Sequence, residues 1–147
     1  MNRSHAYDRV IRALRRSTFS LHNYKEFTVV ARVLIVDDNV DNNVVLRLLI
    51  EHACRVPVEA VATISEAQRA LDAGDIGFAV VDVNLGPGGG DSNAFSRTLN
   101  AYGIPYVRLT GNPDSVPEDV RGLEVLVRAR SGTNQRLLAL VTTQVVR

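Results

Sequence analysis

Three aspartates in this sequence are spaced so that they could do chemistry together. Asp37 and Asp38 directly follow the apolar run 33–36, and Asp82 directly follows the apolar run 78–81. Continuous apolar runs rich in β-branched residues are typical of strands that a parallel sheet buries on both faces. Ligands of such sheets bind beyond the carboxyl ends of the strands, where the strand order reverses. The three carboxylates converge on one site if these two strands are neighbours in the sheet.

Converging carboxylates imply a bound cation. Like charges that lie close together disfavour joint ionisation unless a cation compensates them. Oxygen ligands in a small site favour Mg²⁺ over a soft metal. The alternative is that Asp37 caps a helix and Asp82 only ends a strand. That explanation suits one acid, whereas three acids at the predicted reversal of strand order favour a functional site.

Strand and helix signals alternate from Arg32 onward and supply the elements that position these acids. Strands are predicted over 33–36, 56–62, 78–82, 104–109 and 125–127. The second strand is expected at an edge of the sheet, because Pro57 cannot donate to a central ladder and Glu59 interrupts the apolar run. Strands that alternate with helices indicate an α/β fold with a parallel sheet covered on both faces.

The predicted helices carry apolar stripes and helix-start signals. The first stripe consists of Val40, Val44, Val45, Leu48 and Leu49, and the last consists of Leu137, Leu138, Val141 and Val145. Thr63 and Glu66 fit a capping box for a second helix, and Asp91 or Ser92 is expected to cap a third. Thr133 is expected to cap the last helix. Two prolines and two glycines between 111 and 122 leave room for only one turn, near 118–120.

Length, composition and cysteine count narrow the class of protein. The 147 residues suffice for one domain, and 46% hydrophobic with 22% charged residues is typical of a soluble, core-forming chain. No apolar run approaches the roughly 18–20 residues that span a bilayer, and we expect no secretory signal, because the basic N-terminus lacks an apolar segment of about 7–15 residues. Cys54 is the only cysteine, which excludes a disulfide framework and a multi-cysteine metal site. We expect a cytoplasmic protein.

Residues 1–31 are predicted to be a basic extension of a domain over 32–147. Residues 1–32 contain seven basic and two acidic side chains, whereas residues 33–147 contain ten arginines and fourteen acids. Lys25 is the only lysine, so the predicted domain has none. Apolar residues between 7 and 14 recur at helical spacing, which fits either an amphipathic helix for a membrane surface or partner, or a solvated extension. The acidic domain leaves nucleic-acid binding unsupported.

Three segments resemble the receiver domain of two-component response regulators. They are VLIVDDN at 33–39, VVDVNL at 80–85 and IPYVRLTG at 104–111. The resemblance covers residues 32 to about 146, and 82–111 is most similar to receivers associated with hybrid histidine kinases. It implies a flavodoxin-like, doubly wound, five-stranded parallel sheet in the order 2-1-3-4-5. Here the fourth helix would be shortened or missing.

The resemblance also implies a role for each site residue. Asp82 would be the phosphoacceptor, and its carboxylate would attack the phosphohistidine of a partner to form an acyl phosphate. Asp38 would bind Mg²⁺ directly, Asp37 would assist partly through water, and Asp82 and the backbone carbonyl of Asn84 would be further ligands. Thr110 would donate its hydroxyl to a phosphoryl oxygen, unless it bonds its own backbone as strand-end hydroxyls do.

The sequence departs from the family where a lysine and a proline follow the fifth strand. Arg128 and Ala129 stand there, and arginine differs from lysine in geometry although it also binds phosphate. A cis bond before alanine costs about 2.5–4 kcal/mol, so a trans peptide is expected. Arg130 is a less favoured substitute, and both arginines could instead be solvated. Val125 replaces a frequent aromatic, and Gly86 replaces a frequent proline.

These observations favour a single-domain response regulator in a phosphorelay. The expected partner is a sensor histidine kinase or a histidine phosphotransfer protein, and homodimerisation is left open. The chain would be a phosphoacceptor with only weak self-phosphorylation and dephosphorylation, not an enzyme. The alternative is a pseudo-receiver that binds a protein without being phosphorylated. An aspartyl-phosphate hydrolase would need an Asp-x-Asp motif after the first strand, which 37–39 lacks.

Overall fold

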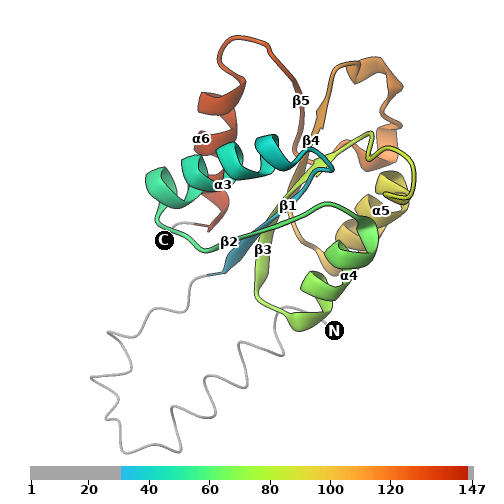
Figure 1. The fold of residues 1–147 in the computed structure, drawn as a ribbon, viewed down its shortest axis with the longest axis horizontal. Coiled ribbons are helices and arrows are strands. Elements are labelled where there is room, and N and C mark those ends of the chain that lie inside the picture. The colour runs from blue at the N-terminus through green and yellow to red at the C-terminus, as the bar shows by residue number, and fades with distance from the viewer. Residues whose placement is uncertain (1–30, 146–147) are drawn as a thin grey trace, which may run out of the picture.

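The computed structural model describes residues 31–145 and confirms the predicted α/β architecture (Figure 1). Five parallel strands form one sheet in the order β2-β1-β3-β4-β5. The strands are β1 (Arg32–Val36), β2 (Val58–Val61), β3 (Ile76–Asp82), β4 (Tyr106–Thr110) and β5 (Glu124–Val127). The helices are α3 (Val40–Cys54), α4 (Ile64–Ala73), α5 (Ser92–Tyr102) and α6 (Thr133–Val145). This is the flavodoxin-like, doubly wound fold.

The sheet is buried on both faces, as the continuous apolar strands predict. Helices α3 and α6 cover one face, and α4 and α5 cover the other (Figure 1). Alternate residues of β1 serve the two sides: Val33 and Ile35 pack beneath α3 and α6, whereas Leu34 and Val36 pack beneath α4 and α5. The central strands are therefore held rigidly, which fixes the positions of the residues at their carboxyl ends.

The caps that the sequence predicts form for two of the helices. The Thr63 hydroxyl accepts a hydrogen bond from the Glu66 backbone at 3.2 Å, and Asp91 accepts from the second and third residues of α5. Thr133 begins α6, but its hydroxyl donates to the Val127 carbonyl at 2.8 Å instead of capping the helix. Strand β2 lies at the edge, as predicted. It is shorter than the predicted range 56–62.

The apolar stripe predicted for α3 is wrong as a core-facing surface. Val40, Val44, Val45 and Leu48 are 70%, 51%, 52% and 60% exposed, and the buried residues of α3 are Leu46, Ile50 and Cys54. The sequence offers two apolar faces on this helix, at 40–48 and at 46–54. The sheet and α6 bury the second, which lies on the opposite side of the helix from much of the first.

The connection between β4 and β5 contains no α-helix, in agreement with the prediction. Two short 3₁₀ turns replace it, η1 (Pro113–Ser115) and η2 (Glu118–Val120). Pro113 and Pro117 lack the N–H groups that a continuous helix would use here.

The predicted extension over 1–31 falls almost wholly outside the described residues. Within 31–145, no helix combines the length and the apolar character that crossing a membrane requires.

Candidate functional site

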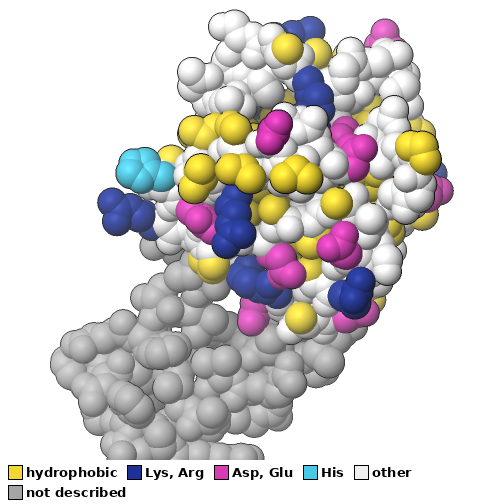
Figure 2. Space-filling model, in the orientation of Figure 1, with side chains coloured by type: hydrophobic (Ala, Val, Ile, Leu, Met, Phe, Trp, Pro, Cys, Tyr) yellow, Lys and Arg dark blue, Asp and Glu magenta, His cyan; other side chains and the backbone are white. Residues whose placement is uncertain are grey.

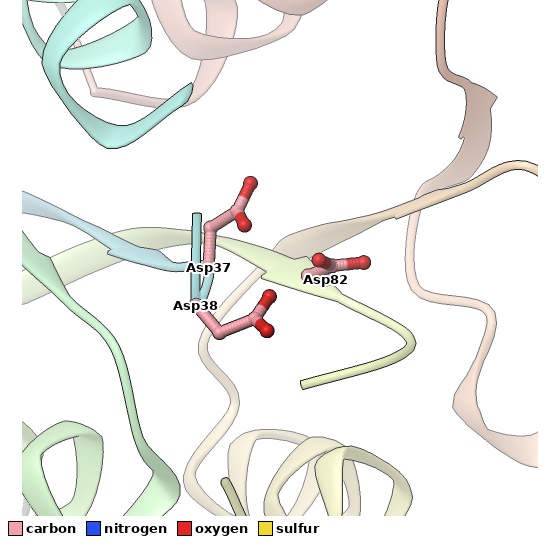
Figure 3. Close-up of side chains that lie close together, drawn as sticks. All are labelled: Asp37, Asp38 and Asp82. Atoms are coloured by element: carbon pink, nitrogen blue, oxygen red, sulfur yellow. The ribbon is translucent and has the colours of Figure 1, made fainter. Parts of the chain in front are cut away.

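The side chains of Asp37, Asp38 and Asp82 converge at the carboxyl edge of the sheet (Figure 3). Strands β1 and β3 are neighbours, with Val36 opposite Val81, so the residues that follow them lie side by side. One oxygen of each carboxylate lies within 4.8 Å of the corresponding oxygens of the other two. Asp37 and Asp82 are buried, whereas Asp38 is exposed. The predicted convergence is confirmed.

Backbone hydrogen bonds orient the two buried carboxylates. Oδ1 of Asp37 accepts from the Asn39 N–H at 2.9 Å, and Oδ1 of Asp82 accepts from the Asn84 N–H at 3.3 Å. Asp37 is not the cap of α3, because the side chain of Asn39 occupies that position and accepts from the Asn42 N–H. The second oxygen of each buried aspartate is therefore left for another partner.

Arg128 is that partner. Its Nη2 donates to Oδ2 of Asp37 at 2.6 Å and lies 3.1 Å from Oδ2 of Asp82. Arg128 directly follows β5, and its backbone N–H donates to the Thr110 carbonyl at 2.9 Å. Of the two arginines that sequence analysis considered, Arg128 thus enters the site, and Arg130 is exposed.

The backbone turns directly after Arg128. Ala129 has φ 59°, in the left-handed region, and no peptide bond among residues 31–145 is cis. Proline cannot adopt this φ, since its ring holds φ near about −65°. The Arg128–Ala129 pair therefore makes a turn that a lysine–proline pair could not make.

Burial and charge act in opposite directions on the acceptor candidate. The net effect raises the pKa of Asp82 from 3.8 to about 6: desolvation is the largest cause, and the charges of Asp37 and Asp38 act in the same direction. The Arg128 guanidinium and the hydrogen bond from the Asn84 backbone lower it. The carboxyl is thus mostly ionised at neutral pH, as a nucleophile must be.

Thr110 and Asn84 lie next to the acids but have local partners. The Thr110 hydroxyl accepts from the Asn112 N–H at 2.9 Å and donates to the Asn112 carbonyl at 3.2 Å. This is the strand-end arrangement that sequence analysis weighed against a role in phosphoryl binding. The side chain of Asn84 accepts from the Gly86 N–H at 3.2 Å.

The donor set fits a small, hard cation. Three carboxylates meet at one point, and oxygen ligands of this kind suit Mg²⁺. Gly86 keeps the approach open, because a Cβ there would lie 3.0 Å from Oδ2 of Asp38. The residues present therefore fit Mg²⁺, with one unusual feature, the guanidinium already bound to two of the carboxylates.

Arg108, a buried arginine beside the site, has no role that the sequence motifs predict. It is fully buried on β4, one residue before the strand position that pairs with Asp82. Its guanidinium donates to the Val120 carbonyl at 2.9 Å and to the side chains of Ser92 and Asn93. The sequence did offer one signal, because this arginine lies within the apolar run 104–109 of a predicted buried strand. Charged residues are almost never buried without partners, so polar partners were to be expected around it.

Comparison with solved structures shows the same fold in proteins of two-component signalling. No protein-family model matches the sequence, and no curated protein matches it. SdrG from Sphingomonas melonis Fr1 is 28% identical over 80% of this chain and 99% of its own, with a TM-score of 0.63. A response regulator receiver protein from Pseudomonas putida is 21% identical over 80% of this chain and 100% of its own, with a TM-score of 0.68.

A CheY-like response regulator receiver domain from Methylobacillus flagellatus is 15% identical over 78% of this chain and 99% of its own. Its TM-score is 0.63. The fold of this chain is thus that of response regulator receiver domains.

Proposed function

We propose that this chain is a receiver in a two-component phosphorelay and accepts a phosphoryl group on Asp82. The observation that supports this most is the position of Asp82, which ends β3 and lies near two further carboxylates that directly follow β1. Together with the receiver fold, this arrangement places an ionisable carboxylate beside a cluster that suits a divalent cation. The chain would act as a phosphoacceptor and not as an enzyme with turnover.

The transfer is a nucleophilic displacement at phosphorus. A carboxylate oxygen of Asp82 forms the new O–P bond while the P–N bond to the partner's histidine breaks, and the imidazole leaves with the electron pair of that bond. Asp37, Asp38, Asp82 and the Asn84 carbonyl would hold Mg²⁺. When bound, Mg²⁺ supplies positive charge for the phosphoryl oxygens. Thr110 would exchange its Asn112 bond for one to the phosphoryl group.

The surface beside the acids suits a protein donor. The exposed side chains of Val40, Val44, Val45 and Leu48 form an apolar stripe along α3 (Figure 2). A neighbouring cavity of about 270 Å³ lies between this helix and the start of α6. Asn42, Arg128 and Thr133 are among its lining residues, so it adjoins the site. An exposed apolar stripe next to a reactive carboxylate favours docking of a sensor kinase or a phosphotransfer protein.

Dimerisation and the type of kinase belong to the same proposal. A beryllofluoride-activated NtrC4 receiver domain is a dimer in solution and is 21% identical to this chain, with a TM-score of 0.62. A homodimer and an association with a hybrid-type histidine kinase remain predictions for this chain.

An intact-mass measurement tests the acceptor. The protein is treated with acetyl phosphate and Mg²⁺, and its mass is compared with that of an Asp82→Asn variant treated in the same way. We expect the wild type alone to gain the mass of one phosphoryl group. If the folded wild type gains no mass from acetyl phosphate or from a phosphorylated donor protein, the chain is a pseudo-receiver that binds partners without modification.

A further inference from the structure

The guanidinium of Arg128 lies where the acidic site would need a cation. One nitrogen contacts an oxygen of Asp37 from β1 and an oxygen of Asp82 from β3, at 2.6 and 3.1 Å. Asp37 is 1% exposed, so its charge has little access to solvent. A charge-assisted hydrogen bond of this length is strong, and a buried carboxylate without it would be unstable. Arg128 therefore supplies positive charge to two of the three carboxylates.

We propose that Arg128 is a built-in cation that competes with Mg²⁺ for Asp37 and Asp82, so that metal binds only when the guanidinium withdraws. This inference rests on the proposed function in taking Mg²⁺ as the ligand of the acidic site. It goes further because it states how the two cations exclude each other. Arg128 binds the carboxylates of Asp37 and Asp82, and Mg²⁺ must displace it.

The Arg128 guanidinium and Mg²⁺ cannot occupy the acidic site together, for two physical reasons. Mg²⁺ needs oxygen ligands at about 2.0–2.1 Å in octahedral geometry, so it must use the same carboxylate oxygens that now accept from Nη2. A guanidinium and a divalent ion at neighbouring positions also repel each other in a partly buried site. Arg128 can leave, because its side chain is 29% exposed and it stands beside the open cavity between α3 and α6.

The turn at Ala129 makes this competition specific to the chain. Its positive φ directs the chain away after Arg128, and the Arg128 N–H stays paired with the Thr110 carbonyl. The base of the arginine is thus fixed to the strand that carries Thr110, while its head remains movable. Withdrawal of the head would accompany metal binding without any change in the sheet.

Calorimetric titration with Mg²⁺ tests the proposal on Arg128→Met, which keeps the stem and removes the charge. Loss of one charge-assisted bond from the competitor predicts a Kd for Mg²⁺ at least about tenfold lower than in the wild type. The matched control is Arg130→Met, which removes the same charge from an exposed neighbour and should change Kd by less than about twofold. Equal affinities in wild type and Arg128→Met, equal tightening in both variants, or no Mg²⁺ binding in any of them would overturn the competition.

A second measurement uses the wild type and does not depend on a variant's folding. The ¹⁵N resonance of the Arg128 guanidinium should shift during titration with Mg²⁺, and its side-chain protons should exchange faster with water. A resonance that stays unchanged while Mg²⁺ binds would contradict displacement.

The acceptor experiment separates this inference from the proposed function. Tighter Mg²⁺ binding in Arg128→Met without phosphorylation of either protein would support the competition and reject the acceptor. Phosphorylation of Asp82 with equal Mg²⁺ affinities would do the reverse.

Discussion

The guanidinium of Arg108 donates a hydrogen bond to Oγ of Ser92 at 2.8 Å, in a region where both side chains are buried. Ser92 in turn donates to the Val83 carbonyl at 2.6 Å, directly after the acceptor candidate Asp82. The other side of the guanidinium donates to the Val120 carbonyl in η2. One buried arginine therefore connects the loop after β3 to the segment that replaces a helix between β4 and β5.

Replacing Arg108 should destabilise the fold strongly. Arg108→Ala leaves a cavity, strands the Val120 carbonyl and removes the bond that the Ser92 hydroxyl accepts, so we expect a loss of about 3–5 kcal/mol in the free energy of unfolding. Urea denaturation measures it. Arg97→Ala is the control: that arginine also reaches η2, through an exposed ion pair with Asp119, and should cost less than about 1 kcal/mol. Similar losses in the two variants would contradict the role of burial.

Stability without metal should depend on pH through Asp82. Its pKa is raised from 3.8 to about 6 in the folded state, so the folded protein binds this proton more tightly than the unfolded chain. The resulting stabilisation is complete below about pH 4 and is lost as the pH rises through about 6. Urea denaturation in EDTA between these values should show that Asp82→Asn removes this part of the slope. Parallel pH profiles for the two proteins would show that Asp82 is not shifted.

Metal should stabilise the folded state by mass action. Millimolar Mg²⁺ is expected to raise the melting temperature, because it binds the converged carboxylates and not the unfolded chain. Asp38→Asn should reduce that rise, since it removes the exposed ligand. Asp72→Asn removes an acid from α4, away from the site, and should leave the rise unchanged. A wild type whose melting temperature ignores Mg²⁺ would count against a metal site.

The apolar stripe on α3 should affect transfer from a protein donor but not folding. Val44→Gln and Leu48→Gln change side chains that are 51% and 60% exposed, so stability should stay within about 0.5 kcal/mol. Phosphorylation by acetyl phosphate should be unchanged, and transfer from a phosphorylated donor protein should slow. Leu123→Gln is the matched control, because this exposed leucine lies outside the stripe, just before β5. Equal donor rates in all three variants would exclude the stripe as the docking surface.

Deletion of residues 1–28 should leave the domain folded. Within residues 31–145, five strands beginning at Arg32 pair into one sheet and pack into two hydrophobic cores. Circular dichroism and the melting temperature of the shortened chain should match those of the full chain. Loss of folded protein would imply that Tyr7, Ile11 and Leu14 pack against the domain.

The order of elements and the position of the acids could be predicted from the sequence, because both depend on local patterns. Continuous apolar runs mark the central strands, and an acid directly after such a run lies at a known edge of the sheet. The face of α3 could not be predicted in this way. Both of its sides carry valine or leucine, and only packing against α6 decides which side is buried.

The reach of Arg128 and the burial of Arg108 depended on contacts distant in sequence. Arg128 meets Asp37 across 91 positions of sequence, and the positive φ of Ala129 beside it is one that alanine rarely adopts and that no local pattern signals. Arg108 is buried because three polar partners from α5 and η2 surround its guanidinium. Partners of this kind become visible only when the chain is folded.

The two 3₁₀ turns between β4 and β5 have a consequence for local opening. A turn of three residues closes very few backbone hydrogen bonds, so the segment 113–120 lacks the cooperative ladder that an α-helix would give it. In hydrogen exchange, we expect its amides to exchange through small local fluctuations, while amides of β3 exchange only when the whole domain unfolds. If the hydrogen bonds of Thr110 change, the adjoining segment 113–120 can therefore rearrange without first unwinding a helix.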